Sequence, residues 1–95
     1  GPISGSFYEA NIFLELVKKY GSGQIHYWRN KNGNEIDFIL RKDNEILPME
    51  VKLNFNHFSS RPMAAFCQKY KLDDFLVIGL DGEKESAKFI YPWEI

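Results

Sequence analysis

The sequence has few of the features that mark secreted, membrane and nucleotide-binding proteins. Its single cysteine excludes an internal disulfide and is typical of a reducing compartment, so we expect a cytoplasmic protein. No apolar run approaches the roughly 20 residues of a membrane-spanning helix, and no signal peptide is apparent. The sequence also has no glycine-rich loop followed by Lys-Ser or Lys-Thr, so we expect no P-loop nucleotide site in this chain.

The sequence also lacks an excess of charge of either sign. Twelve basic and 13 acidic residues leave a net charge of −1. Proteins that bind nucleic acid on their own usually carry a basic surplus, so this balance argues against a plain DNA-binding module. It argues less strongly against an enzyme that works inside a larger assembly. Ninety-five residues suffice for one small domain, and an aromatic content of 16% supplies bulk for its core.

The N-terminal part divides into a short lead and a helix. Residues 1–6 are interpreted as a tag scar or linker, and residues 7–95 as a single domain from a longer protein. Apolar residues at helical spacing predict a helix over residues 7–20, with Glu9 in the middle of its apolar stripe. Two explanations for Glu9 stay open. It is either an acidic group that faces a functional site, or the partner of Ser6 in a capping box.

The remaining pattern predicts an α/β (α+β) fold. We expect strands at residues 24–30, in a hairpin over 34–53, at 75–80 and at 86–91, and a second helix that begins at Ser59 or Ser60. The order is then α-β-β-β-α-β-β. Four to five strands form a mixed sheet with one helix on each side, and the last strand lies at an edge. The 75–80 run is apolar throughout, as in a strand buried on both faces.

The hairpin brings two acids together. With Asp43-Asn44 at its tip, residues whose numbers sum to 87 face each other, so Ile36, Phe38 and Leu40 share one apolar face with Val51, Met49 and Leu47. Asp37 then opposes Glu50, with Cβ atoms roughly 5 Å apart. A shift of one residue would scramble both faces, whereas a shift of two would not.

Opposed carboxylates repel, and a hard divalent cation between them removes the repulsion. Lys52 lies two residues beyond Glu50 on the same face. Two acids and a lysine on adjacent strands therefore suit metal-assisted hydrolysis of a phosphodiester. The alternative is a solvated hairpin face, on which Glu35 and Lys52 form a surface ion pair worth about 0–1 kcal/mol.

At these residues the sequence resembles a known superfamily. Asp37 followed by Glu50-Val51-Lys52 resembles the PD-(D/E)xK nuclease-like superfamily, although Ile36 stands where the superfamily name has proline. More narrowly, GNEIDFIL and ILPMEVKL resemble the domain of unknown function at the C-terminus of bacterial and archaeal AAA+-type ATPases. Phe7-Tyr8-Glu9 and Tyr27-Trp28-Arg29 are similar to that group as well, so the resemblance spans roughly residues 7–80.

The resemblance implies a restriction-endonuclease-like core and a set of roles. Mg²⁺ or Mn²⁺ would be held by Asp37 and Glu50 with help from the Val51 carbonyl, and Glu9 would be an accessory ligand or base. Lys52 would orient the attacking water or stabilise the transition state. The implied partners are an attached ATPase domain, DNA and a second copy of the chain in a homodimer. Two functions stay open: a metal-dependent nuclease, and a non-catalytic module that regulates the ATPase.

Overall fold

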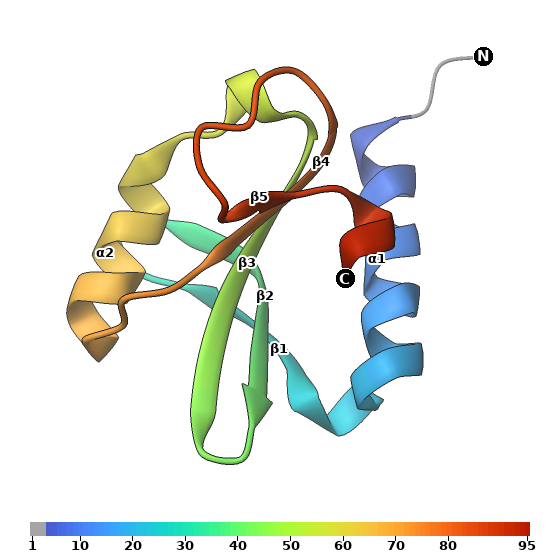
Figure 1. The fold of residues 1–95 in the computed structure, drawn as a ribbon. Coiled ribbons are helices and arrows are strands. Elements are labelled where there is room, and N and C mark those ends of the chain that lie inside the picture. Colours follow the sequence, from blue (N-terminus) through green and yellow to red (C-terminus); the bar gives the residue numbers. More distant parts are fainter. Residues whose placement is uncertain (1–3) are drawn as a thin grey trace.

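The computed structural model describes residues 4–95, in which two helices pack on opposite faces of a five-stranded sheet (Figure 1). Residues 1–3 of the predicted tag scar or linker lie outside the described residues. The α+β class and the predicted element order are confirmed. The elements are α1 (Gly5–Tyr20), β1 (Ile25–Arg29), β2 (Glu35–Lys42), β3 (Glu45–Asn54), α2 (Ser60–Tyr70), β4 (Leu76–Asp81) and β5 (Phe89–Ile90).

The sheet is mixed, as predicted, with the strand order β1-β2-β3-β4-β5. The first three strands pair antiparallel, whereas β4 runs parallel to both β3 and β5. Parallel neighbours need a crossover connection, and α2 supplies it between β3 and β4. Val77 and Ile78 of β4 are fully buried, which explains why the middle of that strand is apolar.

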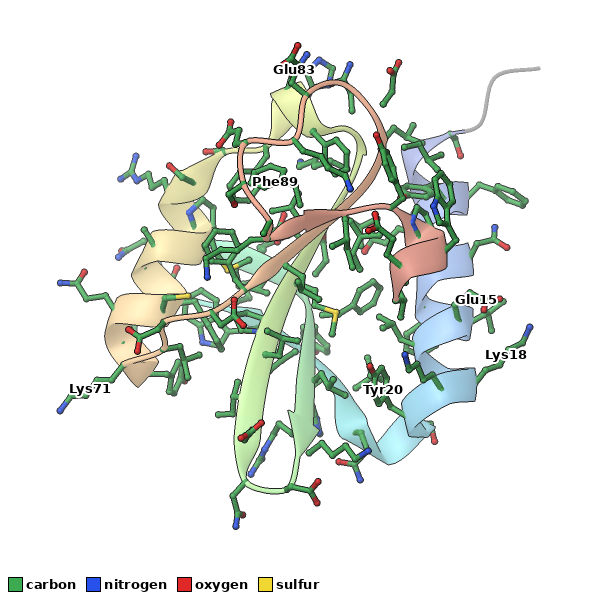
Figure 2. The ribbon with its side chains drawn as sticks, viewed as in Figure 1. Glu15, Lys18, Tyr20, Lys71, Glu83 and Phe89 are labelled. Carbon is green, nitrogen blue, oxygen red and sulfur yellow. The ribbon has the colours of Figure 1, made fainter. Side chains whose placement is uncertain are left out.

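Helix α1 begins two residues earlier than the apolar pattern predicts. Ser4 is its N-cap, and the Ser4 side chain accepts a hydrogen bond of 3.1 Å from the amide of Phe7. Ser6 therefore lies inside the first turn, and the predicted capping box between Ser6 and Glu9 is wrong. Figure 2 shows Glu15 and Lys18 pointing away from the sheet on the outer side of this helix.

The two faces of the sheet carry separate cores. On the α1 face, Tyr8, Ile12 and Leu16 pack on apolar side chains of β1 to β4, whereas Met63 and Phe66 of α2 pack on the other face. A third cluster joins Phe55, Val77 and Phe89 beside the start of the crossover. Strand β2 is covered on both faces, so its middle residues are buried whichever way they point.

Gly79 allows β4 to approach β3 closely next to Lys52. A Cβ atom at Gly79 would lie 2.6 Å from the ring of Phe55 and 2.8 Å from the backbone oxygen of Lys52. We expect Gly79→Ala to lower the free energy of unfolding by about 1–3 kcal/mol, because a buried ring and a backbone must both shift. Urea unfolding measures this change. Gly23→Ala, where a Cβ meets no atom within 4 Å, is the control, and equal losses in the two variants would contradict the prediction.

Candidate active site

The β2–β3 hairpin has the predicted register. Backbone pairs run from Phe38 opposite Met49 to Lys42 opposite Glu45, and each pair sums to 87. Asp43 and Asn44 at the tip have φ angles of 53° and 66°, as a two-residue hairpin turn with two left-handed residues requires. The register shifted by two residues, which the hydrophobic pattern alone permits, is therefore not the one adopted.

A β-bulge interrupts β2 at Asp37. His26 of β1 pairs with Ile39 and Trp28 pairs with Ile36, so three steps along β2 match two steps along β1. Asp37 and Phe38 thus share one place opposite Tyr27. The extra residue turns Ile36 to the α2 face, where it joins the core around Met63 and Phe66. The predicted placement of Ile36 on the same face as Phe38 and Leu40 is wrong for this reason.

At the bulge, the side chains of Asp37 and Glu50 replace the backbone ladder. The amide of Asp37 donates a hydrogen bond of 3.0 Å to Glu50 Oε1. The amide of Val51 donates one of 2.9 Å to Asp37 Oδ2. Each carboxylate therefore reaches across to the neighbouring strand, and the two acids lie together between β2 and β3.

Burial makes this acidic pair hard to ionise fully. Glu50 is only 9% exposed, and burial raises its pKa to about 7, with the charge of Asp37 acting in the same direction. Burial also raises the pKa of Asp37, against the lowering effects of the Val51 amide and the Lys52 ammonium. A hydrogen bond between the two carboxyl groups favours an ionised Asp37 and a protonated Glu50. Burial and mutual repulsion therefore both oppose full ionisation of the pair.

Lys52 lies within electrostatic reach of every acid proposed for the site. Its positive charge lowers the pKa values of Glu9, Asp37 and Glu50. The alternative pairing of Lys52 with Glu35 is not formed, because Glu35 Oε1 instead lies 2.9 Å from the Nε atom of Arg29. Lys52 is half-buried, and its charge acts on all three acids.

Glu9 of α1 stands opposite this pair. Burial raises the pKa of its carboxyl, and the negative charge of Asp37 raises it further. Within residues 4–95, however, no group of three or more His, Cys, Asp or Glu side chains is arranged to hold a metal ion. Glu9 therefore does not join Asp37 and Glu50 as a third close carboxylate in this structure.

The donor set at Asp37 and Glu50 fits a small hard cation. Mg²⁺ usually takes one or two carboxylates together with waters, and buried carboxylates that resist ionisation are stabilised by a positive ion. Val51 lies between Glu50 and Lys52, and its amide rather than its carbonyl contacts Asp37. The residues can hold a divalent cation through the two acids, with water completing the coordination.

A shallow groove of about 180 Å³ adjoins Asp37 on its β1 side. Its lining comes from α1, β1 and β2. Sequence reasoning did not assign the β1 residues to a site, although the Tyr27-Trp28-Arg29 run just before the hairpin was the signal that could have found them. The lining residues are Glu9, Tyr27, Trp28, Arg29, Glu35, Ile36 and Asp37.

Of three comparisons with known proteins, one gave a match. The family model described as "Domain of unknown function (DUF4143)" matches residues 4–94. The match includes residues 4–6, which were interpreted above as part of a tag scar or linker. Neither the curated proteins nor the solved structures gave a match. Within residues 4–95, no helix has both the length and the apolar character needed to cross a membrane.

Proposed function

The chain belongs to the DUF4143 family, and from that premise we propose that it is a nuclease domain that hydrolyses phosphodiester bonds of DNA with Mg²⁺ or Mn²⁺. One observation carries the proposal. The Asp37 carboxylate accepts a hydrogen bond from β3, the Glu50 carboxylate accepts one from β2, and the charge of Lys52 acts on both. The resemblance to the PD-(D/E)xK superfamily and to the C-terminal domain of AAA+-type ATPases supports a restriction-endonuclease-like core. We assign the domain to such an ATPase, in the cytoplasm.

Each residue has a role that its surroundings suit. Asp37 and Glu50 would hold the cation, with water in the remaining coordination positions rather than the Val51 carbonyl that the resemblance implies. When bound, a divalent ion lowers the pKa of a coordinated water and offsets charge on the phosphate. The amide of Val51 fixes the orientation of the Asp37 carboxylate. Lys52 donates hydrogen bonds toward the phosphate oxygens as negative charge develops on them.

Glu9 suits a role in proton transfer rather than tight metal binding. Glu9 is half-buried and lines the groove together with Asp37, and burial and the charge of Asp37 raise the pKa of its carboxyl. A carboxyl with a raised pKa accepts a proton more readily than one in free solution. Glu9 would therefore take up the proton that leaves the attacking water or pass it to solvent.

The test is nicking of supercoiled plasmid and of branched DNA, with Mg²⁺ or Mn²⁺ and with EDTA as the blank. We expect nicking by the wild type and none above the blank by Asp37→Asn, because the amide cannot supply a charged metal ligand. Glu15→Gln is the matched control, since Glu15 is exposed on the outer side of α1. Equal nicking by the wild type and Asp37→Asn would overturn the proposal.

A second candidate is a non-catalytic module that regulates the attached ATPase. The net charge of −1 and the acidic lining of the groove favour it, because both weaken the attraction for DNA. Calorimetric titration with Mn²⁺ separates the two functions. Absence of binding would support the module, whereas binding that Asp37→Asn abolishes, together with nicking, would eliminate it.

A further inference from the structure

We infer that the groove beside Asp37 receives an unpaired base of a single-stranded nucleic acid, stacked on the ring of Tyr27. The inference rests on the proposed function and names the form of its substrate. It adds a binding subsite on β1 to the acidic site on β2 and β3.

Tyr27 is exposed in a way that its neighbours are not. Its side chain is 79% exposed, and within residues 4–95 it belongs to no core cluster, aromatic pair or side-chain hydrogen bond. Trp28 differs, because its ring packs edge-on against Phe66 at 5.1 Å. Core packing therefore accounts for Trp28 and leaves Tyr27 unexplained.

The bulge places Tyr27 beside the acidic pair. Asp37 and Phe38 together oppose Tyr27 on the neighbouring strand. Tyr27 and Asp37 also line the same groove. A base stacked on the Tyr27 ring would thus bring its own or its neighbour's phosphate to Asp37 and Lys52.

An exposed ring at this position selects single strands. The bases of a duplex already stack on one another, so their faces are covered, whereas an unpaired base can lie flat on an aromatic side chain. β1 is an edge strand of the sheet, and the exposed ring of Tyr27 lies on it. We therefore expect a strand to approach the groove from this edge.

The charges of the groove make stacking the main source of affinity. Glu9, Glu35 and Asp37 line it, and the single cation of its lining, Arg29, is paired with Glu35. These acids repel phosphates unless a divalent cation is bound. We therefore expect binding to require a divalent ion and to weaken only slightly as monovalent salt increases, since few phosphates would be neutralised by Lys or Arg.

The test is fluorescence anisotropy with three labelled 12-mers in Ca²⁺: oligo-dT, the same length of duplex, and a strand with abasic spacers. We expect Tyr27→Ala to weaken oligo-dT binding about 5- to 100-fold, as loss of one stacked base does. Tyr27→Phe keeps the ring and should stay within about twofold of the wild type. Trp93→Ala is the control, because Trp93 is 73% exposed and lies outside the groove lining.

The effect of Tyr27→Ala should vanish on the abasic strand and be absent on the duplex. The inference is overturned if the wild type does not bind oligo-dT, if Tyr27→Ala binds it as tightly, or if the abasic strand shows the same loss. Its failure is distinguishable from failure of the nuclease proposal. Asp37-dependent nicking with no role for Tyr27 leaves the nuclease and removes the subsite, whereas Tyr27-dependent binding without nicking removes the nuclease.

Discussion

Mn²⁺ at a hundredfold excess over its Kd is expected to stabilise the folded domain at pH 7.5 by about 2.7 kcal/mol, because the ion binds only the folded pair of acids. At pH 5 the gain should be far smaller, since Glu50 with a raised pKa then keeps its proton and competes with the ion. Urea unfolding with and without Mn²⁺ at the two pH values measures the difference. Glu50→Gln should lose most of the gain, and Glu15→Gln should keep it.

The metal-free domain should lose stability as the pH rises. The Glu50 carboxyl has a pKa of about 7 in the folded state, because burial and then the charge of Asp37 raise it from 4.5. Between these values the folded chain binds more protons than the unfolded chain. The contribution is therefore fully present below about pH 4.5 and disappears by pH 7, a loss on the order of 3 kcal/mol at most.

Other carboxylates make the domain more stable as the pH rises. The contribution of Glu50 is therefore measured as the difference between the wild type and a variant without that carboxyl. Hydrogen bonds from Lys88 and Lys84 lower the pKa values of Asp74 and Glu94, which adds stability as the pH rises through the acid range. Unfolding in EDTA at pH 4.5, 6 and 8 should therefore be compared between wild type and Glu50→Gln. A wild type that gains stability relative to Glu50→Gln as the pH rises would contradict the prediction.

The hairpin register and the meeting of two acids could be predicted because sequence pattern and turn residues agree there. Asp43 and Asn44 suit the left-handed turn, and apolar residues alternate with polar ones in β3 from Met49 to Asn54. A tip fixed in this way brings Asp37 and Glu50 to the same end of the paired region. Only the turn residues and the apolar alternation are needed for this part of the prediction.

The bulge could not be predicted because β2 is buried on both faces. Ile36 and Ile39 pack under α2, whereas Phe38 and Leu40 pack under α1. Ile36 can be buried on either face of the sheet. The alternation of apolar and polar residues in the sequence therefore gives no sign of the extra residue that makes the bulge. The N-cap was missed for a similar reason, since Ser4 and Ser6 are both good caps and only the backbone of α1 decides between them.

The charge of Lys52 leads to the last prediction. Lys52→Ala should slow nicking by about 10²- to 10³-fold, the usual loss when one donor to a developing negative charge is removed. Its affinity for Mn²⁺ should stay unchanged or rise, because a cation next to Asp37 and Glu50 opposes a second one. Asp37→Asn should instead lose both metal binding and nicking.

Single-turnover nicking rates and calorimetric Mn²⁺ titrations on the same samples separate these two roles. A lysine that serves only to balance the buried acids would behave differently from a catalytic one. Its removal would raise the pKa of Glu50 further and shift the pH dependence of nicking, but saturating Mn²⁺ at high pH would restore the rate. A rate that stays low under those conditions assigns Lys52 to the transition state, and a restored rate assigns it to the electrostatics of the metal-free pair.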